Sequence, residues 1–387
     1  MNDYYADLHI HIGRTMTGKP VKITGAKSLT FTNIIEHARN EKGLNIIGII
    51  DCHSPEVLLE IEQLMEAGDI IEHEDGGFMF GDLTIIPGSE LEIYDENCHG
   101  PIHVLCFFPT LEKMKLFSHW LSHHLKNITL SSQRIYVSGR DLQQKTKELG
   151  GLFIPAHVFT PFKSLYGKGV NKSLTEVFNK EQIDAIELGL SSDTFMADKI
   201  EELHHYSFIT NSDAHSLKKI AREYQVLSLN EPTFHEIEKA LKGMGGRKIK
   251  ANYGLDPLLG KYHGTTCAQC VEPSAPNSTV CTHCGSTKFI KGVADRIAEL
   301  KTSSSTSANR PPYIHQVPLE FIPGLGAKML EKLLNHFGTE MAILHKVSQE
   351  KLAEIIPAKT AELIVKAREG KLSLTAGGGG KYGKIAD

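Results

Sequence analysis

Three side chains of the kinds that bind metal ions occur at every second position near the start of the chain. The stretch reads YADLHIH, in which Asp7, His9 and His11 are separated by single apolar residues. Successive side chains of a β-strand point to opposite faces, so these three would share one face while the apolar residues pack on the other. A carboxylate and two imidazoles on one face suit a divalent metal ion. A strand with an exposed polar face is the alternative, and the rest of the chain decides between them.

Carboxylates and histidines also stand at the ends of later apolar runs. Asp213 and His215 follow FITNS and repeat the spacing of two. In a barrel of strands and helices, active sites assemble where the carboxyl ends of the strands meet. Two or three divalent ions are expected, and the many histidines favour Zn²⁺ or Mn²⁺ over Mg²⁺. Clustered ions can activate water and stabilise charge on a phosphoryl group. The residues expected to bind them are His9, His11, Asp51, His53, Glu90, His103, His157, Asp213 and His215.

The elements that would position these residues alternate along residues 1–245. Short apolar runs are followed by helix-like segments, which favours an α/β architecture with a mainly parallel sheet, and the number of repeats favours a barrel. Strands are expected at 4–12, 45–50, 83–93, 102–108, 152–157, 185–189, 207–210 and 225–229. Helices are expected at 33–40, 55–67, 111–125, 141–149, 194–203 and 233–242.

Length and charge indicate more than one module. The chain has 387 residues, of which 41% are hydrophobic and 23% charged, as in a globular protein of two or three domains. No apolar run reaches the roughly 18 residues of a membrane span and no signal peptide opens the chain, so a cytoplasmic location without a membrane is expected. The net charge of −4 combines −8 over residues 1–250 with +4 over residues 251–387. The positive net charge of residues 251–387 is compatible with a nucleic-acid partner.

Four cysteines predict a structural zinc site. Cys267, Cys270, Cys281 and Cys284 have the spacing C-x₂-C-x₁₀-C-x₂-C. Two such pairs can bring four thiolates into a tetrahedron, and in a cytosolic chain one Zn²⁺ is favoured over disulfides. Residues 251–292 are therefore expected to form a zinc-binding module. The module either only holds together a segment too small to bury a core, or also contacts DNA.

The remainder of the chain divides into three segments. Residues 299–316 are polar and of low complexity, which is typical of a flexible linker. Residues 317–372 regain a helical periodicity and are expected to form a DNA-binding domain. The glycine-rich residues 373–387 are expected to be a flexible tail.

One motif in the helical segment predicts contact with DNA. The stretch FIPGLGAKMLEKLLNHFG resembles a helix-hairpin-helix element. Gly324 and Gly326 would let the backbone turn tightly, so that amides at the next helix N-terminus point at a phosphate. Lys328 and Lys332 would then lie near the DNA backbone. A second copy, LAEIIPAKTAELIVKA, lacks the glycines and is expected only to pack. Contacts of this type hold phosphates without reading the base sequence.

Two basic loops could hold a DNA strand beside the metal site. The loop GRTMTGKPVKITGAKS follows the first strand and contains no acidic residue, and FKSLYGKGVNK follows the strand that ends near His157. Loops that only face solvent are an equal alternative. The residues concerned are Arg14, Lys19, Lys22, Lys27, Lys163, Tyr166, Lys168 and Lys172.

The motifs DLHIH, IIDCHSP, PGSELE, HV, PAHVF and NSDAH resemble, in this order, those of the polymerase and histidinol phosphatase (PHP) family. The resemblance covers residues 1–245 and implies a distorted (β/α)₇ barrel with a trinuclear metal site that cleaves phosphoesters. Most of the metal-binding candidates match the family's ligands. The second motif reads Asp51-Cys52-His53 where many members have Asp-His, so either Asp51 or His53 is the ligand. The segment GRTMTGK lacks a further histidine that members often carry, which implies an altered third metal site.

The order of barrel, four-cysteine module, linker and helix-hairpin-helix resembles the endonuclease Q family over nearly the whole chain. This resemblance implies a metal-dependent DNA repair endonuclease that cuts 5′ to a deaminated base (uracil, hypoxanthine or xanthine) or an abasic site and leaves 3′-hydroxyl and 5′-phosphate ends. Damaged DNA, double- or single-stranded, would be its partner. A monomer associated with the nucleoid is expected, and a replication clamp is a candidate recruiting partner.

The expected mechanism gives three residues a catalytic role. Asp213 would bind one metal and orient the nucleophile, His215 would hold a third ion or assist the leaving oxygen, and Glu90 belongs to the same catalytic set. A deaminated base would have to expose its pairing edge, most simply by flipping out of the helix. The candidates for reading that edge are Asn211, Ser191 and Ser192.

Two other functions are open at this point. A PHP-type phosphatase or 3′ exonuclease would use the same metals, but a small substrate needs neither the zinc module nor the helix-hairpin-helix. A non-catalytic DNA-binding adaptor would explain those modules, but the chain retains nearly every ligand-type residue of the barrel.

Overall fold

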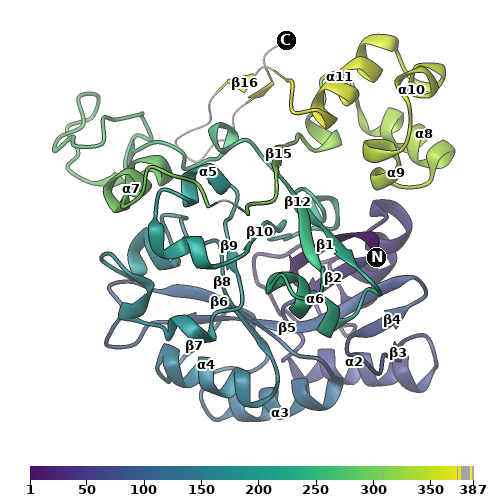
Figure 1. The fold of residues 1–387 in the computed structure, drawn as a ribbon, viewed down its shortest axis with the longest axis horizontal. Helices are drawn as coiled ribbons and strands as arrows, with labels where there is room; N and C mark the ends of the chain where they lie inside the picture. Colours follow the sequence, from purple (N-terminus) through teal and green to yellow (C-terminus); the bar gives the residue numbers. More distant parts are fainter. Residues whose placement is uncertain (308, 373, 376–383, 386–387) are drawn as a thin grey trace.

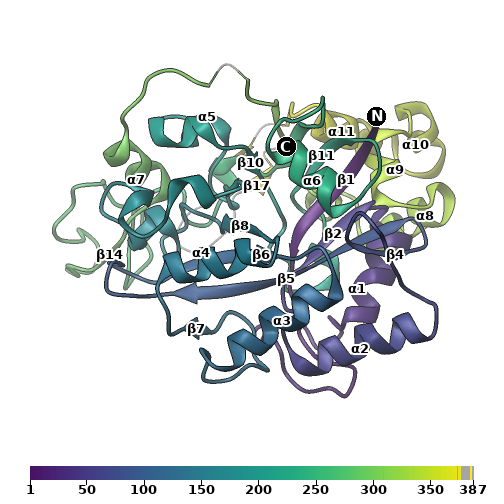
Figure 2. The same ribbon diagram turned by 60° about the horizontal axis from the view of Figure 1, so that its bottom comes forward.

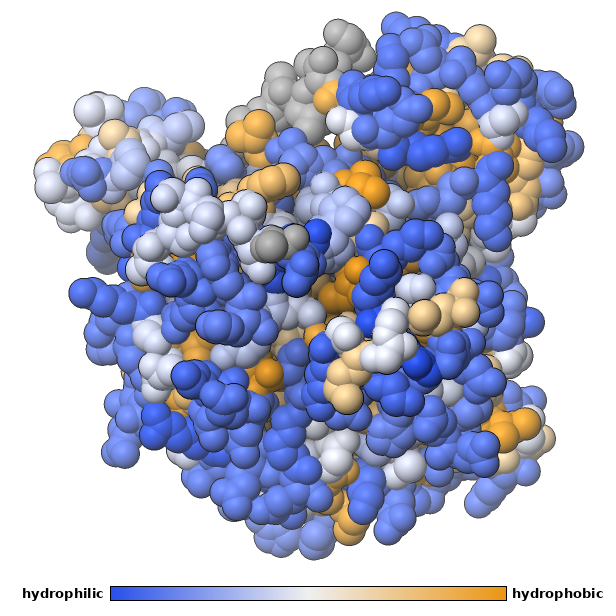
Figure 3. All heavy atoms as spheres, viewed as in Figure 1, coloured by the Kyte–Doolittle hydropathy of each residue, from blue (hydrophilic) through white to orange (hydrophobic). Residues whose placement is uncertain are grey.

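The computed structural model describes residues 1–307, 309–372, 374–375 and 384–385. The tail expected at 373–387 lies outside the described residues, apart from two short paired strands, β16 (Leu374–Thr375) and β17 (Lys384–Ile385). No helix within the described ranges is long and apolar enough to cross a membrane. The surface visible in Figure 3 is hydrophilic over most of its area.

Seven of the described strands close into a barrel (Figures 1 and 2). They are β1 (Asn2–Ile10), β2 (Ile46–Ile49), β5 (Leu83–Ile93), β6 (Ile102–Phe107), β8 (Leu152–Pro155), β9 (Ile186–Glu187) and β10 (Phe208–Ile209). β1, β2 and β5 pair in parallel, as do β9 and β10. A backbone hydrogen bond of 3.0 Å from Val158 N to Glu187 O joins the end of β8 to β9. A parallel bridge between Ile10 and Ala214 closes the ring.

The barrel departs from a fully parallel arrangement at one strand. β6 runs antiparallel to both β5 and β8. This reversal distorts the ring, and the expected distorted (β/α)₇ barrel is confirmed. The pairing of β1 with β2 also shifts register between Asp7 and Ile10, so the alternation expected for the first motif breaks there.

Short helices follow the strands and lie outside the barrel. They are α1 (Phe31–His37), α2 (Pro55–Glu66), α3 (Leu111–Ser122), α4 (Gly139–Glu148), α5 (Thr194–Ala197) and α6 (Phe234–Leu241). Figure 1 shows α2, α3 and α4 along the bottom of the molecule, below β5 and β6. α1, α3, α4 and α6 each begin at a serine or threonine whose side chain accepts a hydrogen bond from the N–H three residues on. Such caps satisfy amides that have no partner within the helix.

The hydrophobic core has two layers separated by the strands. The smaller cluster takes buried residues from β1, β2, β5, β6, β8 and β10, such as Leu8, Leu105 and Ile154, so it fills the barrel. Phe234 and Ile237 of α6 belong to the same cluster. The larger cluster packs the outward faces of the strands against the helices.

Further strands extend the sheet beyond the barrel. β11 (Tyr224–Leu229) pairs with β1, β12 (Lys248–Gly254) pairs with β11, and β15 (Tyr313–His315) pairs with β12. β3 (Ile71–Glu72) and β4 (Phe78–Phe80) form a hairpin edge beside β5, and β7 (Arg134–Ile135) pairs with the end of β5.

The segment 299–316 differs from the flexible linker that its composition predicts. It ends in the strand β15, and Arg310 Nε donates a hydrogen bond of 2.9 Å to the buried carboxylate of Asp198. Arg310 also donates to the backbone oxygen of Leu203 at 2.8 Å. One guanidinium can satisfy several acceptors at once, so Arg310 helps to hold the described part of this polar stretch against the barrel.

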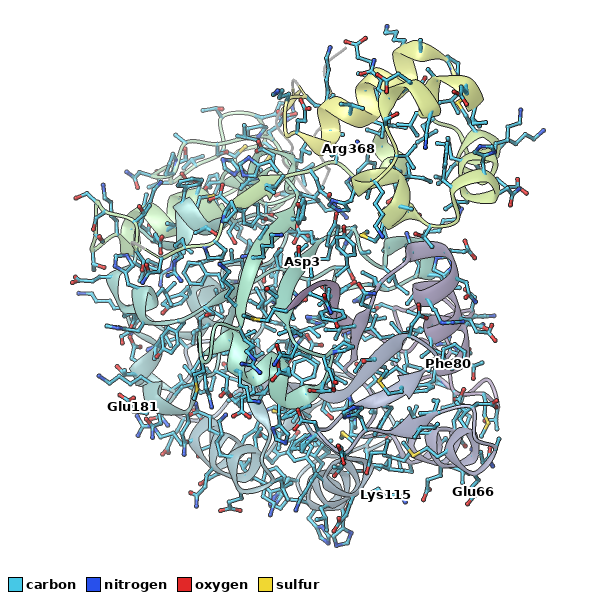
Figure 4. The ribbon with its side chains drawn as sticks, turned by 45° about the vertical axis from the view of Figure 1, so that its right-hand side comes forward. Asp3, Glu66, Phe80, Lys115, Glu181 and Arg368 are labelled. Carbon is cyan, nitrogen blue, oxygen red and sulfur yellow. The ribbon has the colours of Figure 1, made fainter. Side chains whose placement is uncertain are left out.

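Two smaller modules flank the barrel. One contains β13 (Thr266–Cys267), β14 (Phe289–Ile290) and α7 (Val293–Leu300), with Cys267 at the end of β13 and the other three cysteines between β13 and β14. α8 (Ala327–Phe337), α9 (Glu340–His345), α10 (Gln349–Ile355) and α11 (Ala358–Arg368) form the helical domain. Figures 1 and 2 show the two modules on opposite sides of the barrel. Within the helical domain, Arg368, labelled in Figure 4, donates hydrogen bonds of 2.8 Å to the backbone oxygens of Ile343 and Val347.

The helical domain is joined to the barrel by buried polar and aromatic contacts. Lys42, which is 3% exposed, places its Nζ 2.9 Å from a carboxylate oxygen of Glu340. The ring of His345 stacks on Tyr5 of β1 with centroids 4.7 Å apart, and its Nε2 lies 2.7 Å from the hydroxyl of Tyr224. Separating the buried ion pair between Lys42 and Glu340 would be costly, so the helical domain has a defined position on the barrel.

Candidate metal-dependent active site

Glu90 of β5 lies at the centre of a histidine cluster. Its side chain is 1% exposed. Its Oε1 lies 2.8 Å from His103 Nδ1 and 3.4 Å from His157 Nε2. Oε1 also lies 3.5 Å from His9 Nε2, and Oε2 lies 3.5 Å from His11 Nε2. Burial by itself raises the pKa of Glu90, but the adjacent His103 holds it well below its usual range. A carboxylate thus stands between four imidazoles.

Buried carboxylates hold the outer nitrogens of the two β1 histidines. His9 Nδ1 lies 2.9 Å from Glu187 Oε1, and His11 Nδ1 lies 3.0 Å from Asp51 Oδ2. A carboxylate on one ring nitrogen fixes the tautomer and orientation, and leaves the other nitrogen as a lone-pair donor. The Nε2 atoms of both rings therefore face Glu90 ready to bind a cation.

The donor atoms fit divalent metal ions. The Nε2 atoms of His9 and His11, which face Glu90, are buried without a hydrogen-bond partner among the described residues. Burying such an atom unpaired is costly, and ligation removes the cost. Three groups each bring their ligand atoms within 4.8 Å of one another. They are His9–His11–Glu90, Glu90–His103–His157 and His11–Asp213–His215.

Asp213 and His157 have strained backbones at the mouth of this cluster. Their φ angles are 45° and 31°, a region that side chains disfavour and that occurs repeatedly at active sites. Asp213 Oδ1 lies 3.4 Å from His11 Nε2 and 3.3 Å from His215 Nε2. Burial raises the pKa of Asp213, but hydrogen bonds from His11 and His215 hold it well below its usual range. Asp213 is one-third exposed, so its carboxylate lies where a substrate can reach it.

Asp7 supports the loop that carries Asp213 and does not join the cluster. Its two oxygens accept hydrogen bonds from the backbone of Ser212 at 3.1 Å and of Ala221 at 2.9 Å. The register shift in β1 explains this, because it separates Asp7 from the face that His9 and His11 share.

Of the two residues Asp51 and His53, only Asp51 contacts the histidine cluster in the structure. Asp51 contacts the cluster through His11, and its Oδ1 is buried without a partner among the described residues. Both ring nitrogens of His53 are occupied: Nδ1 lies 2.8 Å from Ser89 Oγ and Nε2 lies 3.3 Å from Leu130 O. His53 belongs to none of the three ligand groups, so the structure does not bring this predicted ligand to the cluster.

Lys22 enters the cluster from the first basic loop. Its Nζ lies 3.1 Å from Glu90 Oε2, and its side chain is 14% exposed. Burial lowers the pKa of Lys22, but the carboxylates of Glu90, Asp51 and Asp213 raise it overall, so it is a cation. The sequence predicts Lys22 as a DNA contact on the rim, whereas the structure places it inside the cluster.

The four cysteines form a compact tetrad. Cys267 Sγ lies 3.5 Å from Cys284 Sγ, and Cys270 Sγ lies 3.6 Å from Cys281 Sγ. Four thiolates around one Zn²⁺ have sulfur–sulfur distances of about 3.8 Å for Zn–S bonds of about 2.3 Å, so the tetrad fits zinc. The backbone N–H of Cys270 lowers the pKa of Cys267 to about 6, which favours the thiolate that zinc binds.

The helix-hairpin-helix motif has the geometry that its glycines predict. Gly324 has a φ of 79°, and Gly326 caps α8 with no side chain across the helix N-terminus. The amides of the first turn are therefore open to a phosphate. Lys328 and Lys332 are exposed on α8. The second copy begins α11 after Pro357, and Thr360 of α11 packs against Gly324.

A scan of protein-family models found no match to the chain. The Bacillus subtilis (strain 168) uncharacterized protein YqxK is 59% identical over 385 residues, an alignment that covers 100% of each chain. The structure resembles the crystal structure of the lesion-specific endonuclease PfuEndoQ from Pyrococcus furiosus, with a TM-score of 0.85 and 34% identity over 99% of this chain and 95% of that one. The chain belongs to the endonuclease Q family. It is thus a metal-dependent DNA endonuclease.

A second endonuclease Q structure is equally similar. It contains a 27-mer duplex substrate with an abasic lesion at the active site, and matches with a TM-score of 0.85 and 33% identity over 99% of this chain and 96% of that one. The Methanocaldococcus jannaschii uncharacterized protein MJ0043 is 39% identical over 251 residues, which make up 59% of this chain and 31% of that protein.

Other candidate DNA contacts of this endonuclease Q family member lie around the cluster. Lys163 Nζ lies 2.8 Å from Glu92 Oε2, and Lys168 lies over the ring of Phe162. Lys19 pairs with Glu56 on the surface, while Arg14 donates to its neighbour Gly13 at 2.7 Å. Lys27 and Lys172 are exposed. Tyr166, which the sequence places beside these lysines, is buried with its hydroxyl 2.8 Å from Glu202, so it does not face DNA.

The candidates for reading a base are buried in other contacts. Asn211, 2% exposed, accepts from Leu8 N at 2.8 Å and donates to Glu187 Oε1 at 2.8 Å. Ser192 donates to Leu188 O at 2.7 Å, and Ser191 is 5% exposed beneath Gly260. The structure therefore does not place these three at an open surface of the site.

Sequence reasoning missed Glu187. It lies in the apolar run of β9 and is 1% exposed. Its oxygens accept from His9, from the backbone of His157 at 2.8 Å and from Asn211. The signal was an acidic residue inside a strand otherwise made of apolar residues, because a charge is buried in such a position only when it is paired.

Proposed function

We propose that this protein cuts DNA on the 5′ side of a deaminated base or an abasic site, leaving 3′-hydroxyl and 5′-phosphate ends. The observation that carries the proposal is the full-length similarity to an endonuclease Q whose duplex has an abasic lesion at the active site, together with the cluster around Glu90. Uracil, hypoxanthine and xanthine are the bases concerned.

The cluster supplies what hydrolysis of a phosphodiester requires. Two divalent ions bound here would activate water and offset charge on the phosphoryl group. His9, His11 and Glu90 would hold one ion, and Glu90, His103 and His157 the other. Asp213 is the accessible carboxylate at the mouth. It would orient the attacking water by accepting a hydrogen bond from it.

His215 is the group beside the leaving oxygen. Its Nε2 faces Asp213 and its Nδ1 lies 3.1 Å from the hydroxyl of Thr24. At 36% exposure, its ring is open to substrate. A histidine held at both nitrogens can deliver a proton to an oxygen that leaves as a 3′-hydroxyl.

The flanking modules are suited to holding a duplex on both sides of the barrel. The helical domain offers open helix amides and exposed lysines to phosphates without reading sequence. Lesion recognition then falls to the barrel mouth, where a flipped nucleotide would enter. We expect a cytoplasmic enzyme associated with nucleoid DNA, and a monomeric state and a recruiting replication clamp stay predictions.

The test uses end-labelled duplexes that differ at one nucleotide. Full-length protein with Mn²⁺ or Mg²⁺ is incubated with a duplex containing one deoxyuridine, one deoxyinosine or one abasic site, and with the undamaged duplex. We expect a single product that ends immediately 5′ to the lesion, absent from the undamaged duplex and abolished by EDTA.

Other outcomes favour the other functions. Gradual shortening of both duplexes from their 3′ ends would favour an exonuclease, and binding of DNA without cleavage under every metal would favour an adaptor. Direct sealing of the nick by a DNA ligase, which joins a 3′-hydroxyl to a 5′-phosphate, would show that the cut leaves these two ends. A product that no ligase seals would contradict the proposed chemistry.

A further inference from the structure

Two tyrosines, an arginine and a lysine form an exposed group at the carboxyl end of β5, outside the metal cluster. The guanidinium carbon of Arg134 lies over the ring of Tyr94, 4.8 Å from its centroid, and over the ring of Tyr136, 5.4 Å from its centroid. Lys126 Nζ lies 5.3 Å from the centroid of the Tyr136 ring. Tyr94 is 39% exposed and Tyr136 is 51% exposed. We call these four residues the tyrosine–arginine surface.

The strand β5 connects this surface to the metal cluster. Glu90 and Glu92 are alternate residues of β5, so they point to one side of it, and Glu92 Oε2 lies 3.7 Å from His103 Nε2. Tyr94 follows at the next alternate position, just past the end of the strand. The pairing of β5 with β7 sets Arg134 opposite Glu92. Four residues separate Glu90 from Tyr94, which corresponds to about 13 Å of extended backbone.

The two cations are held in place without being neutralised. Arg134 donates a hydrogen bond of 2.5 Å to the backbone oxygen of Tyr94, which fixes the direction of its guanidinium. Neither Arg134 nor Lys126 forms an ion pair with a carboxylate of the described residues. An aromatic face attracts a cation and orients it, but it leaves the positive charge in place, whereas a carboxylate would cancel it. Both charges are therefore available to an anionic partner.

The acidic residues nearby do not reverse this charge. Glu92 lies 2.8 Å from the ammonium of Lys163. Asp95 accepts hydrogen bonds of 2.8 Å from two backbone N–H groups, one of them at the start of α4. Glu96 is exposed on the same loop. Within the described part of the chain, two unpaired cations thus stand against one unpaired carboxylate, and the local charge is positive.

We propose that the tyrosine–arginine surface holds the phosphate backbone of the DNA beside the cut, with the tyrosine rings positioning Arg134 and Lys126 against the phosphates. Fixed positive charge of this kind positions nucleic acid without reading its sequence. DNA is favoured over an acidic protein segment because the surface continues the strand that carries Glu90. The inference deepens the proposed function and rests on it for the place of the cut, but not for the binding of DNA.

The salt dependence of binding tests the charges. A fluorescent undamaged duplex is titrated with full-length wild type, Arg134→Gln and Lys126→Gln, and the anisotropy is followed at several salt concentrations. Each variant should bind about fivefold more weakly at moderate salt, and its slope of log affinity against log salt should fall by about 0.9, because one phosphate contact is lost. An affinity and slope equal to those of wild type in both variants would overturn the proposal and would leave an acidic protein segment as the partner.

A change of the ring alone tests the role of the tyrosines. Tyr136→Leu keeps both cations but removes the face that orients them. Its affinity for the same duplex should fall about threefold, while its salt slope stays that of wild type, because the slope counts the phosphates contacted. Tyr136→Phe keeps the face and should bind as wild type does. Equal binding by Tyr136→Leu and wild type would contradict a positioning role for the ring.

Neutral phosphates locate the contact. A strand of B-form DNA rises 3.4 Å per nucleotide, so about 13 Å corresponds to about four nucleotides. Single methylphosphonates are placed along a duplex with one abasic site. Cleavage by wild type should slow at a phosphate within about four nucleotides of the cut, and Arg134→Gln should be insensitive at that phosphate. Identical profiles in the two proteins would overturn the proposal.

The matched control is Arg39→Gln. Arg39 also lies over an aromatic ring, 5.8 Å from the centroid of Phe80, but it pairs with Asp82. Phe80, labelled in Figure 4, stands opposite Leu83 at the amino end of β5, about 36 Å of extended strand from Tyr94. Arg39→Gln should keep the affinity and the salt slope of wild type, and melting curves exclude unfolding of any variant. An equal loss in Arg39→Gln would show a general effect of charge and contradict the proposal.

The two proposals fail separately. A wild-type protein that binds DNA but cuts no lesion would refute the proposed lesion specificity alone. The salt slopes are measured on undamaged DNA, so they still decide whether the tyrosine–arginine surface holds phosphates.

Discussion

Glu187 and His9 form a buried pair in which the carboxylate lies 2.9 Å from Nδ1 of the imidazole. The pair leaves Nε2 of His9 facing Glu90 and Asp213. Because the outer partner of a ligating histidine fixes its orientation and basicity, Glu187→Gln should weaken Mn²⁺ binding about 10–100-fold. Isothermal titration with Mn²⁺ measures the change.

Glu202→Gln is the matched control for that variant. Glu202 also accepts from a buried side chain, Tyr166, but lies away from the metal cluster. Mn²⁺ affinity should be unchanged in Glu202→Gln. Equal losses in the two variants would show that the effect comes from general destabilisation rather than from the histidine.

Asp213→Asn should separate binding from cleavage. The amide keeps the size of the side chain but loses the negative charge that lies 3.4 Å from His11 and 3.3 Å from His215. We expect cleavage of a uracil duplex to fall by about 100-fold or more, with DNA affinity retained in a gel-shift assay. Unaltered cleavage would remove Asp213 from the chemistry.

The buried Glu223 should make stability depend on pH. Burial raises its pKa to about 7, so the folded protein keeps a proton there that the unfolded chain loses near pH 4.5. The stability from the neutral carboxyl is present below that pH and is lost as the pH rises through 7. Glu223→Gln should therefore stabilise the protein at pH 8 by about 3 kcal/mol.

Denaturant unfolding of both proteins at pH 5 and pH 8 measures this effect. Glu223 accepts from Leu255 N at 2.8 Å and from Thr210 Oγ1 at 2.7 Å. Glutamine can accept the first hydrogen bond through its oxygen and donate its amide to the Thr210 hydroxyl, which reverses the second. The gain should be small at pH 5 and grow toward pH 8. A gain that is the same at both values would mean that Glu223 does not titrate in this range.

The zinc module should unfold when its metal is removed. Cys281→Ser removes one of four thiolates, so the variant should bind no Zn²⁺, because a small module gains its folding energy from the ion. Zinc analysis and proteolysis of residues 267–284 report the loss. Cys98→Ser, outside the tetrad, should keep its zinc.

Charge reversal on α8 should change DNA binding without changing the position of the cut. Lys328→Glu with Lys332→Glu places two negative charges where phosphates are expected to lie. The affinity should fall for damaged and undamaged duplexes alike, and the slope of log affinity against log salt should fall by about 0.9 per lost contact. An effect confined to damaged DNA would contradict a phosphate-holding role.

Much of the barrel could be predicted from the sequence because its strands are short apolar runs with ligand residues at their ends. The strand β5 has the bounds that its pattern predicts, and β2 and β10 lie within theirs. The strand β15 was missed because its sequence follows a polar, proline-containing stretch, and it is held by pairing with β12, a partner that no local pattern reveals.

The metal-binding residues of the candidate site could be predicted from the sequence, but the residues that orient them could not. His9, His11, Glu90, His103 and His157 meet as their spacing predicts. Asp7 shares that spacing, but a register shift sends it to a loop. The side chain of Lys22 points toward Glu90, and that of Asn211 points toward Glu187. Both directions are set by tertiary contacts, which the local sequence pattern does not reveal.

The strand β1 joins two distant parts of the molecule. Tyr5 lies beneath His345 of the helical domain, and His9, four residues on, lies in the metal cluster. A strand rises about 3.3 Å per residue, so the two anchors are about 13 Å apart along one extended backbone. The strand therefore sets the distance between the helical domain and the cluster, so that a duplex held by that domain, as proposed, would present one phosphate of its backbone to the metal site rather than several neighbouring ones.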